Sequence, residues 1–183
     1  MTRRTLLMLL AGAGALGGVI VATACAATQR PDGGQGHLAV GTAAPDVKGV
    51  DQHGDDRSVA SARGQFLVVY FYPKDGTPGC TAEACAFRDA WQRFEDAGVM
   101  IYGVSGDDQA SHAEFAEEHD LPFPLIADPK GEWSRHFGVG TFLGMTERVS
   151  FVIDPQGTVV ARYPDVDPGV HANQVLDDID KLR

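Results

Sequence analysis

The amino-acid sequence predicts an α/β fold with a central mixed β-sheet, helices on both of its faces and a leading β-hairpin. Two continuous apolar runs, Phe66–Tyr72 and Val99–Ser105, have the composition of strands that are covered on both faces. A helical pattern lies between them, which indicates a parallel pair of strands with a right-handed crossover. Farther along the chain, the turn Asp154–Gly157 separates two shorter strand-like runs and therefore predicts an antiparallel hairpin.

The boundaries of the elements follow from glycine and proline at the ends of apolar patterns. The first buried strand ends at Pro73, and Pro78 with Gly79 forms a tight turn before a helix with apolar residues at helical spacing. In chain order, the sequence predicts a hairpin over 47–59, a strand over 66–72, a helix over 80–97, a strand over 99–105, a helix over 109–120, a strand over 123–127, a helix over 132–137, strands over 148–153 and 158–163, and a helix over 171–182.

Residues 1–24 have the layout of an export signal. Arg3 and Arg4 precede an uncharged, apolar and glycine-rich run, and the paired arginines indicate the twin-arginine route. Residues 25–36 are polar and glycine-rich without an apolar period, which predicts a flexible tether. Residues 37–183 then form one domain without an internal repeat. We therefore expect an exported bacterial protein, in the periplasm or on the outer face of the cell membrane.

The signal can end in three ways around Cys25. Ala22-Thr-Ala24 satisfies the rule for simple cleavage, and the same stretch is similar to a lipoprotein signal in which Cys25 becomes the lipidated N-terminus. The run Leu6–Ala24 is also just long enough to remain as a membrane anchor. Lipidation at Cys25 explains an odd third cysteine in an exported chain and provides a membrane tether.

The charge of the chain is acidic. The formal net charge is −10, and removal of residues 1–24 takes away two arginines and no acidic residue, so the remainder carries −10 − 2 = −12. Proteins that bind nucleic acid need a basic face for the phosphates. We therefore expect no nucleic-acid partner.

Cys80 lies at or just before the N-terminus of the helix that follows the first buried strand. The unpaired backbone N–H groups and the positive end of the helix dipole stabilise an anion at that position. A thiol there tends to ionise, and the thiolate is the nucleophilic form of cysteine. The strand, turn and helix within Tyr70–Asp89 therefore predict a reactive cysteine around which the rest of the chain is organised.

Cys85 follows five positions later on the same predicted helix. On an ideal helix, five steps separate the two Cα atoms by about 8.6 Å, whereas a disulfide needs about 4.4–6.8 Å. If Cys80 and Cys85 form a disulfide, the first turns of the helix must therefore unwind. A permanent structural disulfide is the alternative in an exported protein, but its short loop would constrain little of the unfolded chain.

The segment Phe71–Asp89, Phe-Tyr-Pro-Lys-Asp-Gly-Thr-Pro-Gly-Cys-Thr-Ala-Glu-Ala-Cys-Ala-Phe-Arg-Asp, resembles the active-site segment of the peroxiredoxins, specifically the bacterioferritin-comigratory-protein or peroxiredoxin Q group. The resemblance covers about residues 38 to 183. It implies a thioredoxin-like fold and a thiol-dependent peroxidase without a cofactor. It also implies that peroxide oxidises Cys80, the peroxidatic cysteine, to a sulfenic acid and that Cys85, the resolving cysteine, then forms a disulfide with it.

The same resemblance assigns the residues of the peroxide pocket. Thr77 and Pro78 complete the pocket, and Arg148, from a distant strand, occupies the place of the family's arginine. The Thr77 hydroxyl, the backbone N–H groups of Gly79 and Cys80 and the Arg148 guanidinium can stabilise a developing negative oxygen. Simpler roles stay open, because Thr77 could be only a helix N-cap and Arg148 only a salt-bridged strand residue. Glu83 also matches a family position, but its place in the first helical turn explains an acid equally well, so Glu83 is not counted as catalytic.

The resemblance also implies an external thioredoxin-like donor that reduces the disulfide. Because both cysteines lie in one chain, the chemistry needs no dimer, and we expect a monomer. The six histidines form no metal-binding pattern, so we expect no metal site and a surface position for most of them. The sequence does not distinguish hydrogen peroxide from lipid or other organic hydroperoxides as the substrate, although no apolar insertion is evident near the pocket.

Two other functions of the thioredoxin-like class stay open. A copper-delivery protein would pair two cysteines with a distant histidine such as His136, but three residues separate the cysteines of that family and four separate Cys80 from Cys85. An exported thiol-disulfide oxidoreductase would carry Cys-x-x-Cys, in which the cysteines are closer. Titration of the reduced protein with copper(I) and an assay of disulfide reduction would distinguish both from a peroxidase.

Overall fold

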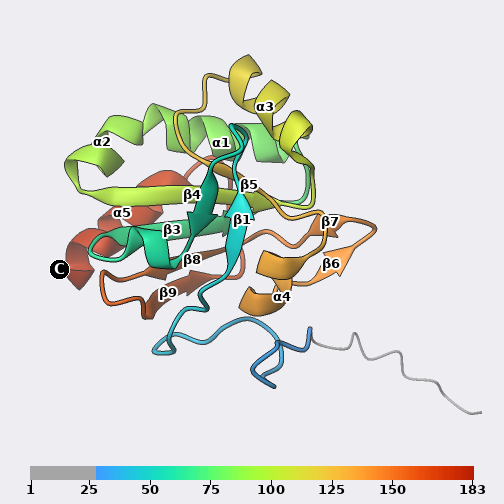
Figure 1. The fold of residues 1–183 in the computed structure, drawn as a ribbon. Coiled ribbons are helices and arrows are strands. Elements are labelled where there is room, and N and C mark those ends of the chain that lie inside the picture. The colour runs from blue at the N-terminus through green and yellow to red at the C-terminus, as the bar shows by residue number, and fades with distance from the viewer. Residues whose placement is uncertain (1–27) are drawn as a thin grey trace, which may run out of the picture.

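The central sheet has five strands in the order β5-β4-β3-β8-β9 (Figure 1). β3 Phe66–Phe71 lies in the middle, parallel to β4 Val99–Ser105 and antiparallel to β8 Val149–Ile153. β5 Leu125–Ala127 extends the parallel half, and β9 Val159–Tyr163 extends the antiparallel half. The predicted mixed sheet is therefore confirmed.

The computed structural model describes residues 28–183, so the predicted export signal and Cys25 lie outside the described residues. The remaining elements, in chain order, are β1 Lys48–Val50, β2 Asp56–Ser58, the 3₁₀ helix η1 Ala60–Ala62, α1 Pro78–Asp89, α2 Trp91–Asp96, α3 Gln109–Glu118, α4 Glu132–Phe137, β6 Thr141–Phe142, β7 Met145–Thr146 and α5 His171–Leu182. β1 and β2 pair as the predicted leading hairpin. No helix in this described part combines the length and the apolar character needed to cross a bilayer.

Alternate residues of β3 contribute to two separate cores, one on each face of the sheet. Val68 and Tyr70 pack in the core that contains residues of α1, α2, α3 and α5. Leu67 and Phe71 pack in the core that contains residues of α4, η1 and the chain next to the leading hairpin. Every residue of β3 is buried, which explains why its sequence is apolar without alternation.

Residues 28–36, which the sequence predicts as part of a flexible tether, form a closed loop on the domain. The Arg30 guanidinium donates to the Gly36 carbonyl at 2.8 Å. Gly138, at the end of α4, approaches the same carbonyl so closely that a Cβ at that position would lie 1.8 Å from its oxygen. The described part of the predicted tether is therefore packed beside the end of α4.

Several elements are one or two residues shorter than predicted, for example β5 and α3, and two larger features differ from the sequence prediction. The helix predicted over 80–97 begins earlier, at Pro78, and is interrupted at Ala90, whose φ of −91° and ψ of 0° separate α1 from α2. Nothing in the structure explains this interruption. The hairpin of β6 and β7 is absent from the prediction, because strands of two residues show no alternation in the sequence.

Candidate active site

The loop between β3 and α1 is held by the carboxylate of Asp75. Its Oδ1 accepts from the Tyr72 hydroxyl at 2.7 Å, and its Oδ2 lies 2.8 Å from both the Ser111 hydroxyl and His112 Nδ1. The Asp75 backbone N–H donates to Asp107 at 2.9 Å. Burial alone would raise the pKa of Asp75, but the hydrogen bonds from these side chains outweigh burial and lower it. The loop is therefore tied to the end of β4 and the start of α3.

Thr77 and Pro78 form the start of α1. Thr77 takes the N-cap position with an extended backbone, and Pro78 is the first helical residue. Cys80 is therefore the third residue of the helix, within its first turn, two positions further into the helix than the sequence predicts. The Thr77 hydroxyl does not cap the helix but donates to the Lys74 carbonyl at 3.0 Å. The simple N-cap role therefore does not describe this side chain, whose oxygen can still accept a hydrogen bond.

Arg148 brings a positive charge to the sulfur of Cys80. It directly precedes β8, and its Nη2 lies 3.2 Å from Cys80 Sγ although the two residues are 68 positions apart in the sequence. The Cys80 side chain is buried, so water screens this contact little. Gly79 leaves room for the guanidinium, because a Cβ at this position would lie 3.3 Å from Arg148 Nη2. The structure thus brings together a helix N-terminus, a thiol and a cation.

Glu83 is a residue of this site that the sequence prediction left out. It lies one turn after Cys80 in α1, is 0% exposed and forms an ion pair with Arg148 Nη1. Burial raises the pKa of Glu83 to about 7, although the Arg148 charge acts in the opposite direction. Its second oxygen, Oε1, has no hydrogen-bond partner within residues 28–183. The sequence did contain one signal for Glu83, namely its position three residues after Cys80 on the same helix. Because the helix dipole and capping explain an acid at the start of a helix equally well, this signal did not identify Glu83 as part of the site.

Cys85 lies in the second turn of α1, half-buried, and both described cysteines are free thiols. Because α1 is continuous across them, the ideal-helix separation of about 8.6 Å between the two Cα atoms applies. A disulfide needs about 4.4–6.8 Å. Formation of a bond between Cys80 and Cys85 therefore requires the intervening turn to unwind.

Two of the six histidines are fully buried instead of lying at the surface, namely His112 and His171. His171 Nε2 lies 2.8 Å from the Ser150 hydroxyl, and the His171 ring packs edge-on against Phe87 of α1. Burial lowers the pKa of His171 to about 4. Across residues 28–183, no group of three or more His, Cys, Asp or Glu side chains is arranged to hold a metal ion.

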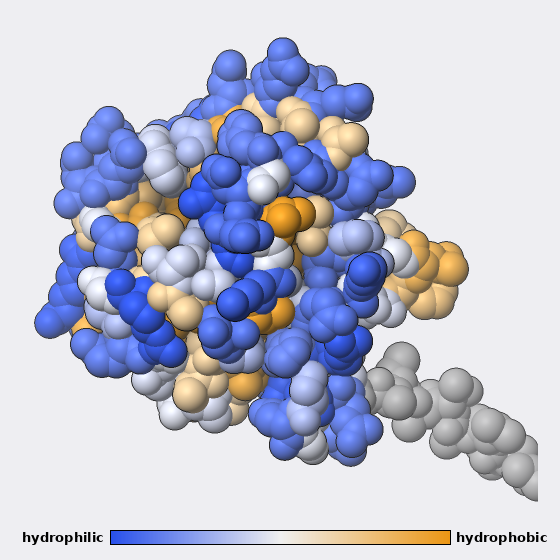
Figure 2. Space-filling view, viewed as in Figure 1, coloured by the Kyte–Doolittle hydropathy of each residue, from blue (hydrophilic) through white to orange (hydrophobic). Residues whose placement is uncertain are grey.

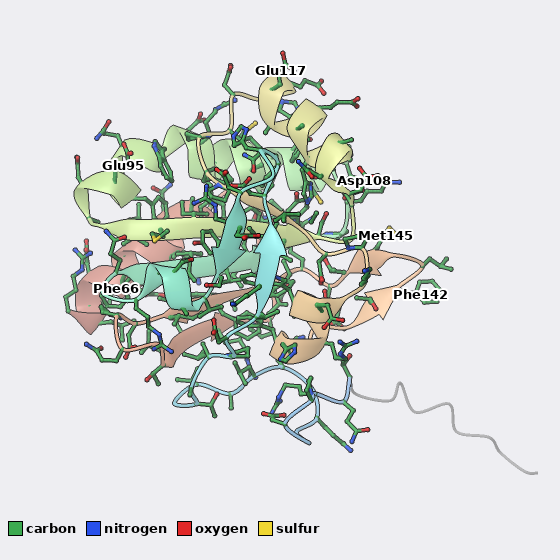
Figure 3. The ribbon with its side chains drawn as sticks, in the orientation of Figure 1. Phe66, Glu95, Asp108, Glu117, Phe142 and Met145 are labelled. Carbon is green, nitrogen blue, oxygen red and sulfur yellow. The ribbon has the colours of Figure 1, made fainter. Side chains whose placement is uncertain are left out.

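An apolar hairpin, formed by β6 and β7, lies next to the active-site loop. Thr146 Oγ1 donates to the Tyr72 carbonyl at 2.6 Å, which joins β7 to the end of β3. Phe142 and Met145, labelled in Figure 3, line an open hollow of about 870 Å³ together with Pro73. An apolar segment that the sequence analysis did not identify therefore lies beside the active-site loop.

Comparison with known proteins gives one family. A family model described as AhpC/TSA family matches residues 40–162. Peroxiredoxin Bcp of Bacillus subtilis (strain 168) is 36% identical over 147 residues, which cover 76% of this chain and 93% of that protein. The chloroplastic peroxiredoxin Q of Oryza sativa subsp. japonica is 41% identical over 147 residues. That match covers 77% of this chain but 66% of the plant protein, so the chain spans just under two thirds of the plant relative's length.

The solved structures agree with this result. Peroxidoxin BcpB from Mycobacterium tuberculosis has a TM-score of 0.75 to this chain at 31% identity, over 80% of this chain and 99% of that one. Together with the observed sheet, this likeness confirms the predicted thioredoxin-like fold. The matched range 40–162 contains Cys80, Cys85 and Arg148. The chain therefore belongs to the AhpC/TSA family, within its peroxiredoxin Q and Bcp group.

Proposed function

We propose that the protein is a thiol-dependent peroxidase that reduces hydrogen peroxide and organic hydroperoxides. The observation that carries this proposal is the buried thiol of Cys80 in the first turn of a helix, with the Arg148 guanidinium 3.2 Å from its sulfur. The helix N-terminus and the guanidinium both stabilise the thiolate, which is the nucleophile. Membership in the peroxiredoxin group supports the same reaction.

In the first step, the Cys80 thiolate attacks one oxygen of the peroxide. The S–O bond forms as the O–O bond breaks, and the departing oxygen takes a proton and leaves as water or an alcohol. The Arg148 guanidinium and the backbone N–H groups from Gly79 onward stabilise the negative charge on the departing oxygen. The Thr77 hydroxyl oxygen accepts a hydrogen bond from the peroxide and so orients it, and Pro78 closes the pocket beside it. The product is the sulfenic acid of Cys80.

In the second step, the thiolate of Cys85 attacks the sulfenic sulfur. The S–S bond forms, the S–O bond breaks, and the oxygen leaves as water after taking up a proton. The turn between the cysteines unwinds to allow this bond. A thioredoxin-like dithiol then reduces the disulfide by exchange and is itself oxidised. Because one chain supplies both cysteines, a monomer completes the cycle.

We also propose that residues 37–183 act on the outer side of a bacterial cell membrane. The basis is the sequence of residues 1–24, with Cys25 as the lipidation candidate. Mass spectrometry of the N-terminal peptide from the native membrane fraction distinguishes a lipidated Cys25 from a cleaved or a retained signal. A chain found only in the cytoplasm would refute the proposed location.

No observation on the described residues favours a copper-delivery protein or a thiol-disulfide oxidoreductase. His136, the candidate copper ligand, belongs to α4, whose buried residues pack in the core on the opposite face of the sheet from Cys80. The peroxidase is therefore the one function that we propose.

The test is stopped-flow mixing of the reduced full chain with hydrogen peroxide and with an organic hydroperoxide, followed by mass analysis. Trp91 is a suitable fluorescent reporter, because only Ala90 separates it from the end of α1 and its ring centroid lies 6.0 Å from that of Phe123. We expect fast oxidation with the loss of two hydrogens, localised to Cys80 and Cys85. Oxidation no faster than that of a free thiol would reject the peroxidase.

A further inference from the structure

The hairpin tip, which we define as Phe142–Met145, exposes large apolar side chains. Phe142 is 73% exposed, Leu143 is 83% exposed and Met145 is 41% exposed. In Figure 2 this hairpin is a hydrophobic projection at the edge of a mostly hydrophilic surface. Leu143 also has a positive φ of 50°, which is costly for a residue other than glycine or asparagine. The turn thus keeps a bulky apolar side chain in a backbone conformation where glycine or asparagine would be less strained.

The hairpin segment itself carries no charged side chain that would favour its exposure to water. The sequence from Gly138 to Thr146 contains no charged residue, in a chain whose formal net charge is −10. The first carboxylate after this segment in the sequence, Glu147, lies 2.8 Å from His37 Nε2. Gly106, which precedes Asp107 and Asp108, packs against Gly144 of the tip, and these two carboxylates accept hydrogen bonds from Ser105 and from the Ser111 backbone. The next residue, Arg148, is directed inward to Cys80 and Glu83. An uncharged apolar tip suits the apolar interior of a bilayer, and its lack of charged groups gives it no means to pair with a charged protein surface.

The described chain begins beside the hairpin tip. Thr28, its first residue, lines the same hollow of about 870 Å³ as Phe142 and Met145. In Figures 1 and 2 the N-terminal end of the described chain lies on the hairpin side of the domain. Cys25 precedes Thr28 by three residues, a span of at most about 11 Å. A tether at Cys25, or the apolar run before it, would hold this side of the domain against a membrane.

We propose that the hairpin tip inserts into the surface of a phospholipid bilayer and that the bilayer is its physiological partner. The inference rests on the proposed function, because it takes the membrane-side location from there. Insertion brings Pro73 and the active-site loop to the lipid surface, since Pro73 lines the hollow beside the tip. Hydroperoxides carried on phospholipid acyl chains then become favoured substrates. A second copy of the chain is a poorer occupant, because three side chains offer far less than the roughly 800 Å² per partner of a stable interface.

The test uses the full chain reconstituted into phosphatidylcholine vesicles, with and without bromine on the acyl chains. Phe142→Trp places a fluorophore at the tip. The matched control is Leu182→Trp, at another exposed apolar residue, which is 45% exposed. Its neighbour Arg183 lies over the ring of Phe66, at the opposite end of β3 from the hairpin. We expect brominated lipid to quench the fluorescence of the Phe142→Trp chain about twofold more than that of the control. Equal quenching of the two chains would overturn the proposal.

A second measurement connects the contact to activity. In Phe142→Ser/Leu143→Ser, we expect the reduction of a phosphatidylcholine hydroperoxide in vesicles to slow about tenfold or more, because the lost apolar insertion weakens lipid contact. Reduction of hydrogen peroxide should stay unchanged. An equal loss with both substrates, or a dimer in sedimentation that the double substitution abolishes, would overturn the proposal. If the wild-type chain fails to reduce hydrogen peroxide, the proposed peroxidase function is rejected. The quenching measurement still tests the contact between the hairpin tip and the bilayer in that case.

Discussion

Replacement of Arg148 by alanine removes two contacts of one guanidinium. Nη2 lies 3.2 Å from Cys80 Sγ, and Nη1 pairs with the buried Glu83. The substitution therefore removes a cation from the thiolate and leaves a carboxyl group buried without its partner. The first loss should reduce the rate of peroxide attack, and the second should reduce stability, so the two effects can be measured separately.

The rate effect follows from the strength of a charge-assisted hydrogen bond. Such a bond contributes about 1.5–3 kcal/mol, and each 1.36 kcal/mol changes a rate about tenfold. We expect the second-order rate constant for oxidation of Cys80 by hydrogen peroxide to fall about 10- to 150-fold in Arg148→Ala. Stopped-flow fluorescence of the reduced full chain, with mass analysis of the product, measures this constant.

The stability effect has its own control. Removal of one partner of a buried ion pair typically costs about 3–5 kcal/mol, but Glu83, whose pKa is already about 7, can take up a proton and so limit the cost. Arg148→Ala/Glu83→Gln removes the stranded carboxylate and should recover most of the lost urea midpoint without recovering the rate. Arg162→Ala, at an exposed arginine of β9, should change neither. A wild-type rate in Arg148→Ala, or a rate restored by Glu83→Gln, would refute the electrostatic role.

Three further predictions follow from the site and the core. Cys80→Ser should abolish peroxide turnover, whereas Cys85→Ser should consume one peroxide per chain and lose recycling by thioredoxin; full turnover by Cys80→Ser contradicts the assignment. Gly79→Ala should slow the oxidation of Cys80 about threefold to tenfold, because the added Cβ would lie 3.3 Å from Arg148 Nη2 and displace the guanidinium. Stopped-flow kinetics measure this rate, and an unchanged rate contradicts the explanation. The folded state lowers the pKa of His171 from 6.5 to about 4, so the unfolded chain binds more protons and stability falls as pH falls through this window. Urea unfolding at pH 7 and pH 5 should show a loss of about 2 kcal/mol from this group, absent in His171→Gln; the same loss in that variant contradicts the assignment.

Elements with clear local boundaries were predicted well from the sequence. The bounds of β4, α4 and α5 agree with the predicted ranges 99–105, 132–137 and 171–182. In each of them, a local sequence signal marks where the apolar pattern stops. After α4, for example, this signal is Gly138, which adopts a left-handed backbone conformation. The sequence also placed Cys80 at the N-terminal end of a helix, although Pro78 starts that helix two residues earlier than predicted.

Contacts between distant parts of the chain were predictable only through resemblance to a family. The proximity of Arg148 to Cys80 was expected because a known family carries an arginine in that place, and the pairing of Arg148 with Glu83 was not expected. Nothing in the sequence connects Asp75 with His112, because their contact depends on how α3 packs against the active-site loop. The sequence analysis also did not predict the hairpin tip. Its apolar side chains are exposed, so they do not form the periodic apolar pattern by which a buried face is recognised in a sequence.

The two chemical steps that we propose require opposite states of the same helical turn. Peroxide attack needs α1 intact, because its N-terminus and the ion pair between Arg148 and Glu83 build the thiolate site. Disulfide formation needs the turn between the cysteines to open, which moves Glu83 from a site where its pKa is about 7 into water, where carboxylates ionise readily. Solvation of that carboxylate at neutral pH therefore offsets part of the cost of unwinding. Beyond the turn, Phe87 is 0% exposed and stacks on Tyr70 with ring centroids 4.8 Å apart, so the rest of α1 stays packed while the turn opens.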